Sequence, residues 1–152
     1  MGGDGPKPAD GIMRGTTHLF PVRVYFEDTD LAGIVYYANY LRFVERARSD
    51  MLRLIGIDQR GALEAGEGVY VVAEVSVKYH APAKLADDLV IVTEIDKLRA
   101  ATVLIHQRVM RGDEILADVR VTAAFLTPEG RPRRHPGQWV ETFERLLEEG
   151  RE

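Results

Sequence analysis

The chain has 152 residues, enough for one domain of ordinary size, and 45% of them are hydrophobic. Its 20 basic and 24 acidic residues give a formal net charge of −4, which is not the basic balance of a protein that binds nucleic acid. The absence of cysteine excludes a disulfide framework, a thiolate nucleophile and a cysteine-based metal site. We expect a cytoplasmic protein without a membrane span, since no apolar run approaches the roughly 20 residues that cross a bilayer.

Two parts of the chain are distinguished by composition. Residues 1–17 are rich in Gly, Pro and Asp and lack the pattern of a signal peptide, so we expect a disordered leader. Residues 18–152 contain no repeat or linker, and we expect a single domain. Within it, residues 18–27 alternate apolar and polar side chains and predict a β-strand. Residues 37–55 change to helical spacing, and Gly56 is a suitable helix stop.

Four further strands are predicted after a Gly-containing loop. They span residues 69–80, 88–97, 101–111 and 115–126, and a closing helix is expected over residues 138–149. Short connections between long strands indicate an antiparallel sheet. The order predicts an α+β fold in which five to six strands wrap around one long helix. Such a sheet keeps a free edge, so we expect at least a homodimer.

The most informative segment lies between the first strand and the long helix, where Glu27, Asp28 and Asp30 are three acids within four positions. A carboxylate held opposite a helix start can act as nucleophile or general base, while free backbone N–H groups receive developing negative charge. Acidic residues in a turn also hydrogen-bond to their own backbone without any catalytic role. From these three residues alone, both interpretations stay open.

The residues after the acids favour a functional loop. Gly33 permits a positive φ or a close backbone approach. Residues 34–37 are apolar or aromatic, which is unusual for a solvated loop. A carboxylate beside such a wall would be partly desolvated, and desolvation raises its pKa, whereas helix N-terminal amides lower it.

This segment closely resembles the active-site loop of the hotdog-fold acyl-CoA thioesterases, in the 4-hydroxybenzoyl-CoA thioesterase family. Within that family it is most similar to the acyl-CoA thioesterases associated with the Tol-Pal system. The shared pattern, acid-x-Asp-x-x-Gly-x-Val, then an aromatic pair and a Tyr three residues on, is present without a gap. The resemblance covers almost all of residues 20–143. It implies a hotdog fold, hydrolysis of an acyl-CoA to a carboxylic acid and coenzyme A, and active sites at a dimer interface, often within a homotetramer.

The resemblance also implies residue roles in the loop. Asp30 would be the catalytic carboxylate, as nucleophile or as general base. Tyr37 would hold the carbonyl oxygen through its backbone N–H at the helix start. An apolar pocket for the acyl group would lie near Gly33, Val35 and Tyr36, with contributions from the partner subunit.

Three other polar residues near the loop are expected to be structural. Asp28 is expected to order the loop, and Asn39 to cap the helix. A different hotdog subfamily uses a helix glutamate as its catalyst. With Asp30 present, we expect Glu45 to form a surface ion pair or an interface contact instead.

The phosphates of coenzyme A require basic partners. By resemblance, a turn between two strands would supply them through Arg99 and Thr102, although the two residues between are Ala here. Lys84, in the family's Ala-Pro-Ala-basic segment, is a second phosphate candidate. We interpret the basic run over residues 131–134 as a solvated loop.

Other chemistries lack their sequence patterns. The chain has no Gly-x-Ser-x-Gly elbow, no P-loop and no His spacing typical of a metal site. No metal or redox cofactor is implied, and coenzyme A enters as part of substrate and product. A hotdog dehydratase would need a His near the long helix, and none lies between His18 and His80. A non-catalytic acyl-CoA-binding or scaffold protein of the same fold stays open as the alternative.

Overall fold

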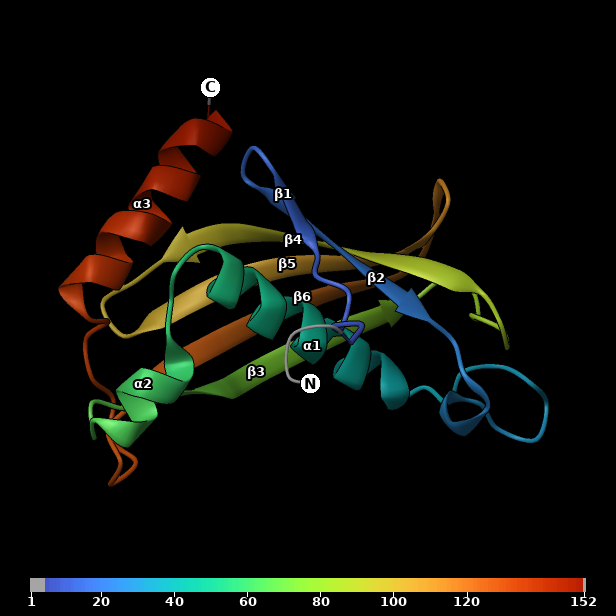
Figure 1. Ribbon diagram of the computed structural model, residues 1–152, viewed down its shortest axis with the longest axis horizontal. Helices are drawn as coiled ribbons and strands as arrows, with labels where there is room; N and C mark the ends of the chain where they lie inside the picture. The colour runs from blue at the N-terminus through green and yellow to red at the C-terminus, as the bar shows by residue number, and fades with distance from the viewer. Residues whose placement is uncertain (1–4, 152) are drawn as a thin grey trace.

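The computed structural model describes residues 5–151, in which six strands form one antiparallel sheet (Figure 1). The strands are β1 (Ile12–Arg14), β2 (Thr17–Arg23), β3 (Val69–Tyr79), β4 (Asp88–Leu98), β5 (Thr102–Arg111) and β6 (Glu114–Leu126). The helices are the 3-10 turn η1 (Phe26–Asp28), α1 (Asn39–Leu54), α2 (Gln59–Glu64) and α3 (Gly137–Arg151). The order across the sheet is β1-β2-β4-β5-β6-β3, so the short β1 and the long β3 form its two edges.

The long helix α1 lies across one face of this sheet (Figure 1). Its buried side chains recur every three or four residues and face the strands. They are Tyr40, Phe43, Val44, Ala47, Met51 and Leu52. In β5 and β6 buried residues alternate with more exposed ones, so the sheet presents one apolar face to the helix. The expected α+β arrangement, with strands wrapped around a long central helix, is confirmed.

Two local features differ from the sequence expectations. The first strand ends at Arg23 because residues 26–28 form η1, which is closed by a hydrogen bond from Tyr25 N–H to Asp28 Oδ2 (2.8 Å). The short helix α2 was not predicted. It begins after Asp58, whose Oδ1 accepts a hydrogen bond from Gly61 N–H at 2.9 Å. Gly56 ends α1 as expected, with a φ of +91°. No helix of the described residues is both long and apolar enough to span a bilayer.

The structure also differs from the disordered leader expected over residues 1–17. Residues 12–14 form β1, which pairs with β2, and β2 already begins at Thr17. The segment before β1 is fixed to α1, because Asp50 accepts a hydrogen bond from Gly11 N–H (2.9 Å) and Arg53 bridges Asp10 (2.6 Å) and Asp50 (3.0 Å). Composition did not predict this hairpin because its partners lie on a distant helix. Residues 1–4 lie outside the described residues.

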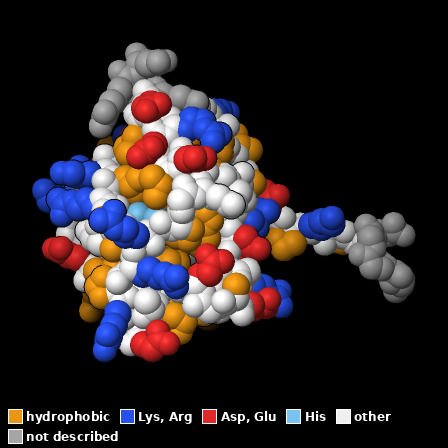
Figure 2. Space-filling view, turned by 90° about the vertical axis from the view of Figure 1, so that its left-hand side faces the viewer, with side chains coloured by type: hydrophobic (Ala, Val, Ile, Leu, Met, Phe, Trp, Pro, Cys, Tyr) orange, Lys and Arg blue, Asp and Glu red, His pale blue; other side chains and the backbone are white. Residues whose placement is uncertain are grey.

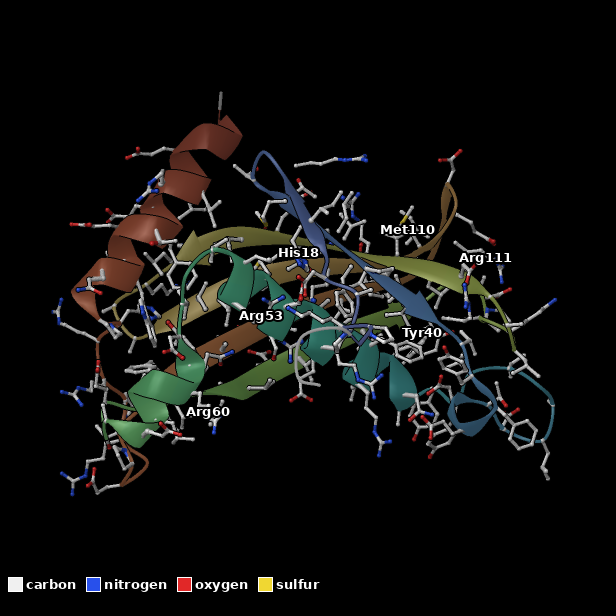
Figure 3. All side chains as sticks on the ribbon, viewed as in Figure 1. His18, Tyr40, Arg53, Arg60, Met110 and Arg111 are labelled. Atoms are coloured by element: carbon white, nitrogen blue, oxygen red, sulfur yellow. The ribbon has the colours of Figure 1, made fainter. Side chains whose placement is uncertain are left out.

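His18 completes this attachment from inside the protein. It is fully buried on β2, and its Nε2 lies 2.7 Å from Asp50 Oδ2. Figure 3 shows His18 and Arg53 approaching from β2 and α1. Burial alone would raise the pKa of the Asp50 carboxyl, but hydrogen bonds from His18, Arg53 and Gly11 hold that pKa below its usual value. This ionic cluster therefore fastens the N-terminal hairpin to the helix.

Candidate active site

Asp30 lies in the exposed loop between η1 and α1. The loop is a turn in which Asp30 C=O accepts a hydrogen bond from Gly33 N–H (3.1 Å) and Asp30 Oδ1 accepts one from Ala32 N–H (2.8 Å). Gly33 has a φ of +78°, which residues with a side chain rarely adopt, so this turn favours glycine. No described residue donates to Asp30 Oδ2, so one carboxylate oxygen is free to meet a substrate or water.

Asp28 connects η1 to the start of α1. Its carboxylate bonds to the Tyr25 backbone, and its C=O accepts hydrogen bonds from Tyr36 N–H (3.0 Å) and Asn39 Nδ2 (2.9 Å). The geometry agrees with the ordering role expected for Asp28. The cap expected of Asn39 is wrong, because Asn39 is already helical and its side chain holds Asp28.

The start of α1 keeps free backbone donors. The N-cap is Ala38, which makes no side-chain cap, and no described residue accepts a hydrogen bond from Tyr37 N–H. The Tyr37 C=O is fixed by the hydroxyl of Tyr79, which donates to it at 2.8 Å. Uncapped N–H groups at a helix start carry the positive end of the helix dipole and can hold an oxyanion. Sequence reasoning missed Tyr79, since nothing in its strand pattern distinguishes it.

An aromatic group stands beside this helix start. The rings of Tyr36 and Tyr37 are 4.9 Å apart and both are exposed, while Tyr37 and Tyr40 each contact Tyr79 edge-on. Tyr40 itself points into the core at the beginning of α1 (Figure 3). The resemblance implied that Val35 lies near an acyl pocket, but its side chain does not face an open surface of this chain. It is buried, so its side chain anchors the loop on the core.

The candidate phosphate-binding residues lie at opposite ends of the molecule. Lys84 is exposed and pairs with Ile34 in a β-bridge, so it lies beside the acidic loop. Arg99 and Thr102 lie in the turn between β4 and β5, where Arg99 N–H donates to Thr102 C=O at 2.9 Å. The pairing of Arg23 with Asp88 places the other end of β4 near the loop.

The length of β4 therefore separates the two sets of residues. Its 11 residues span about 36 Å at the usual rise of a strand. The end of the molecule that carries the β4–β5 turn presents basic side chains interspersed with acidic ones (Figure 2). Within one subunit, a small ligand whose reacting end lies at Asp30 would therefore not reach Arg99 and Thr102.

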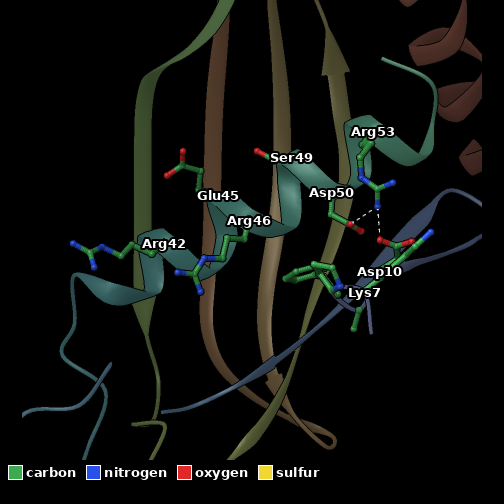
Figure 4. Close-up of a pocket in the computed structure, with 11 residues that line it drawn as sticks. Lys7, Asp10, Arg42, Glu45, Arg46, Ser49, Asp50 and Arg53 are labelled. Carbon is green, nitrogen blue, oxygen red and sulfur yellow. Dashed lines mark hydrogen bonds and ion pairs between the residues drawn. The ribbon is translucent and has the colours of Figure 1, made fainter. Parts of the chain in front are cut away.

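Two of the cavities that α1 helps to line bear on the location of the site. The larger, of about 1050 Å³, is between residues 7–10 and the outer face of the helix (Figure 4). Arg53 pairs there with Asp10 and Asp50, and no residue of the acidic loop lines this cavity. The smaller, of about 260 Å³, lies between α1 and the strands β3, β5 and β6. Neither cavity is lined by residues of the acidic loop.

A sheet wrapped around one helix, with a free carboxylate in the loop before an uncapped helix start, defines a hotdog-type hydrolase. The chain belongs to the thioesterase superfamily, whose family model matches residues 32–117. This confirms the resemblance drawn from the loop pattern.

Named relatives are similar over most of their length. The chain is 40% identical to the acyl-CoA thioester hydrolase YbgC of Escherichia coli O6:H1 over 133 residues, which are 86% of this chain and 98% of that protein. It is 44% identical to the acyl-CoA thioesterase YbgC of Haemophilus influenzae over 105 residues, 69% of this chain and 77% of that one. The crystal structure of a probable thioesterase from Bartonella henselae has a TM-score of 0.75 at 36% identity, covering 79% of this chain and 99% of its own.

Proposed function

We propose that this chain hydrolyses acyl-CoA thioesters to a carboxylic acid and coenzyme A at the loop that carries Asp30. The observation that supports this most is the free Oδ2 of Asp30 in a loop that ends at the uncapped start of α1. The β-bridge between Thr29 and Val35 holds the two arms of that loop side by side. A carboxylate and a set of free amide donors thus belong to one rigid segment.

Two routes are open for Asp30. As a nucleophile, its carboxylate attacks the thioester carbonyl, the coenzyme A thiolate leaves, and water hydrolyses the resulting anhydride. As a general base, it takes the proton of a water that attacks the same carbonyl directly. In both routes the carbonyl oxygen becomes negative, and Tyr37 N–H donates to it. Neither route uses a metal or a redox cofactor, and a cytoplasmic location fits a substrate built on coenzyme A.

We also propose that the active unit is a homodimer formed through the β3 edges. β3 is an unpaired edge of 11 residues whose side chains Val71, Val72 and Val75 are exposed in the single chain. A long apolar edge is an aggregation hazard unless it is paired. Antiparallel two-fold pairing of β3 would extend the sheet to twelve strands, since each copy contributes six.

The dimer accounts for the distance between the candidate ligand residues. Two-fold pairing places the beginning of one β3 beside the end of the other. The β4–β5 turn of one subunit, with Arg99 and Thr102, then comes to the acidic-loop end of its partner. Lys84 of that partner lies beside the same loop, so coenzyme A would be held from both subunits. A tetramer of two such dimers stays a prediction.

The central test is free-thiol release from short-chain, long-chain and aromatic acyl-CoAs by the wild type and Asp30→Asn. The Asn side chain can still accept the Ala32 N–H hydrogen bond, so the turn is preserved. We expect turnover to fall by about 10²- to 10⁴-fold while binding is retained. Asp113→Asn, in the exposed β5–β6 turn, is the matched control and should keep full activity.

Other outcomes would redirect the proposal. If the wild type binds coenzyme A thioesters and hydrolyses none, the chain is the non-catalytic binding or scaffold protein considered above. If Asp30→Asn retains full turnover, the enzyme class holds and another acid is catalytic, with Asp28 tested next and Glu45 after it.

A further inference from the structure

The smaller cavity combines apolar side chains with a half-buried cation, Arg48, and with the exposed acid Glu45. Its volume is about 260 Å³, and α1 forms one wall while β3, β5 and β6 form the other. Leu52, Val72, Val103, Ile105 and Ala123 supply most of the apolar lining. Such a lining suits an acyl chain. Arg48, from the face of α1 that meets the sheet, also lines this cavity.

Arg48 is held in place by a neutral partner. Its Nη1 donates to Gln107 Oε1 at 3.0 Å. Gln107 is fully buried, and its Nε2 donates to Val44 C=O (2.8 Å) and Thr93 Oγ1 (3.0 Å). These bonds fix the amide with its oxygen toward the guanidinium. Arg48 is therefore a positioned side chain with most of its five N–H donors still unused by this network.

Arg48 is half-buried and yet has no carboxylate partner in the described part of the chain, unlike several other arginines. Arg111 pairs with Asp87 at 2.7 Å and Arg120 with Asp96 at 2.9 Å, whereas no carboxylate of the described residues lies within 4.0 Å of Arg48. Burial lowers the pKa of the Arg48 guanidinium, and the charge of exposed Glu45 offsets this only in part. Even partial burial of a cation is costly unless an anion or several acceptors meet it.

The direction of α1 places this cavity near the acidic loop of the other subunit in the proposed dimer. The helix starts beside Tyr79, at the end of β3. Further along the helix, Arg48 lies near Tyr70 and Val72, at the beginning of β3. The helix thus runs opposite to β3 (Figure 1). In the β3-paired dimer, the partner's β3 ends where this β3 begins, so the partner's acidic loop lies next to the cavity.

We propose that this cavity receives the acyl group of a thioester bound at the partner's Asp30, and that Arg48 selects acyl groups with a carboxylate at the end remote from the thioester. The inference rests on the proposed function and its dimer. The apolar lining holds the methylene chain, and the unused donors of Arg48 form a bidentate pair with the terminal carboxylate. Arg48 is therefore a specificity-determining residue, and the substrates are coenzyme A esters of dicarboxylic acids.

The first test compares kcat/KM for matched pairs of straight-chain acyl-CoAs and their dicarboxylic counterparts with about four, six and eight carbons, lengths that a pocket of this volume class can hold. The wild type should prefer the dicarboxylic member by about tenfold or more at one length, as expected of a charge-assisted pair. Arg48→Met should abolish that preference, because kcat/KM for the dicarboxylic member falls about tenfold more than kcat/KM for the plain acyl-CoA. Arg46→Met, on the exposed face of the same helix, is the matched control and should keep the preference.

Equal use of both members by the wild type at every length, or an equal loss of both in Arg48→Met with an unchanged melting temperature, would overturn the inference. If Arg48→Met melts lower, its activity on the plain acyl-CoA serves as the internal reference for folded enzyme. Hydrolysis of neither member by the wild type would instead overturn the proposed function.

The second test asks which subunit supplies Arg48. Asp30→Asn and Arg48→Met are each prepared and then mixed in equal amounts with subunit exchange. If one site uses Asp30 of one chain and Arg48 of the other, half of the dimers carry one intact site, and the mixture recovers about a quarter of wild-type activity on the dicarboxylic substrate. No recovery after verified exchange would place both residues in one subunit and refute the shared pocket.

Discussion

Replacing Val75 by Glu is expected to separate the subunits and to abolish most thioesterase activity. Val75 lies next to the middle of β3, and in a two-fold antiparallel pairing centred on that strand it lies near its own copy. The substitution therefore places two carboxylates near each other at the centre of the interface. Val75 is 39% exposed in the single chain, so part of the cost falls within each subunit, and the control variant below measures that part.

The magnitude follows from two contributions. Complete burial of a valine side chain is favourable by about 1.5–3 kcal/mol, so burying the exposed 39% of two valines contributes roughly 1–2 kcal/mol. Two carboxylates about 5.5 Å apart repel each other by roughly 1–3 kcal/mol between the dielectric of water and that of a protein surface. The sum of about 2–5 kcal/mol corresponds to a rise in the dimer Kd of roughly 30- to 4000-fold.

Sedimentation velocity over a range of protein concentrations measures this Kd, and thiol release in the same samples measures activity. Val90→Glu is the matched control, because Val90 is 38% exposed but lies on the interior strand β4. The control should stay dimeric and active. A Val75→Glu protein that remains dimeric, or that is active as a monomer, would refute the assignment of the dimer to the β3 edge.

Two predictions concern the attachment of the loop and of the N-terminal hairpin. Tyr40→Phe should lower the free energy of unfolding, measured in urea, by about 1–3 kcal/mol. The Tyr40 hydroxyl accepts a hydrogen bond from the buried Ala83 N–H at 2.9 Å, and its removal leaves that donor unsatisfied. A change no larger than that of the exposed control Tyr25→Phe would contradict this. Asp50→Asn should cost about 2 kcal/mol at neutral pH, since charged hydrogen bonds from His18 and Arg53 are lost. Because the folded pKa of Asp50 lies below its unfolded value, this advantage of the wild type should be full above about pH 4 and should fade as pH drops further through the folded pKa. An advantage that grows on acidification would show that the sign of this pKa shift is wrong.

Local patterns in the sequence predicted most of the fold. Alternation along residues 69–126 predicted four strands, and helical spacing predicted α1 to within two residues at each end. These elements were predictable because one buried face imposes a regular period on each of them. The hairpin of β1 and β2 was not, because Gly11 is held by Asp50, 39 residues away, and no local period records such a contact.

The same distinction applies to the candidate site, where local features could be predicted and long-range contacts could not. The turn at Asp30 and Gly33 could be predicted from the sequence. Such a turn depends on residue types at neighbouring positions, and these are visible in the sequence. The hydroxyl of Tyr79 on Tyr37 and the network of Arg48 with Gln107 were not readable, because each joins residues more than forty positions apart. The chemical roles of these residues stay predictions until the variants are measured.

The two edges of the sheet have very different lengths, with 11 residues in β3 and three in β1. A strand needs a long neighbour to add to, and of the two edges of the described sheet β3 is the long one. Once two copies have joined through β3, the outermost strand at each end is the three-residue β1. In the proposed dimer, assembly by strand addition would therefore stop at two chains instead of continuing into a fibre.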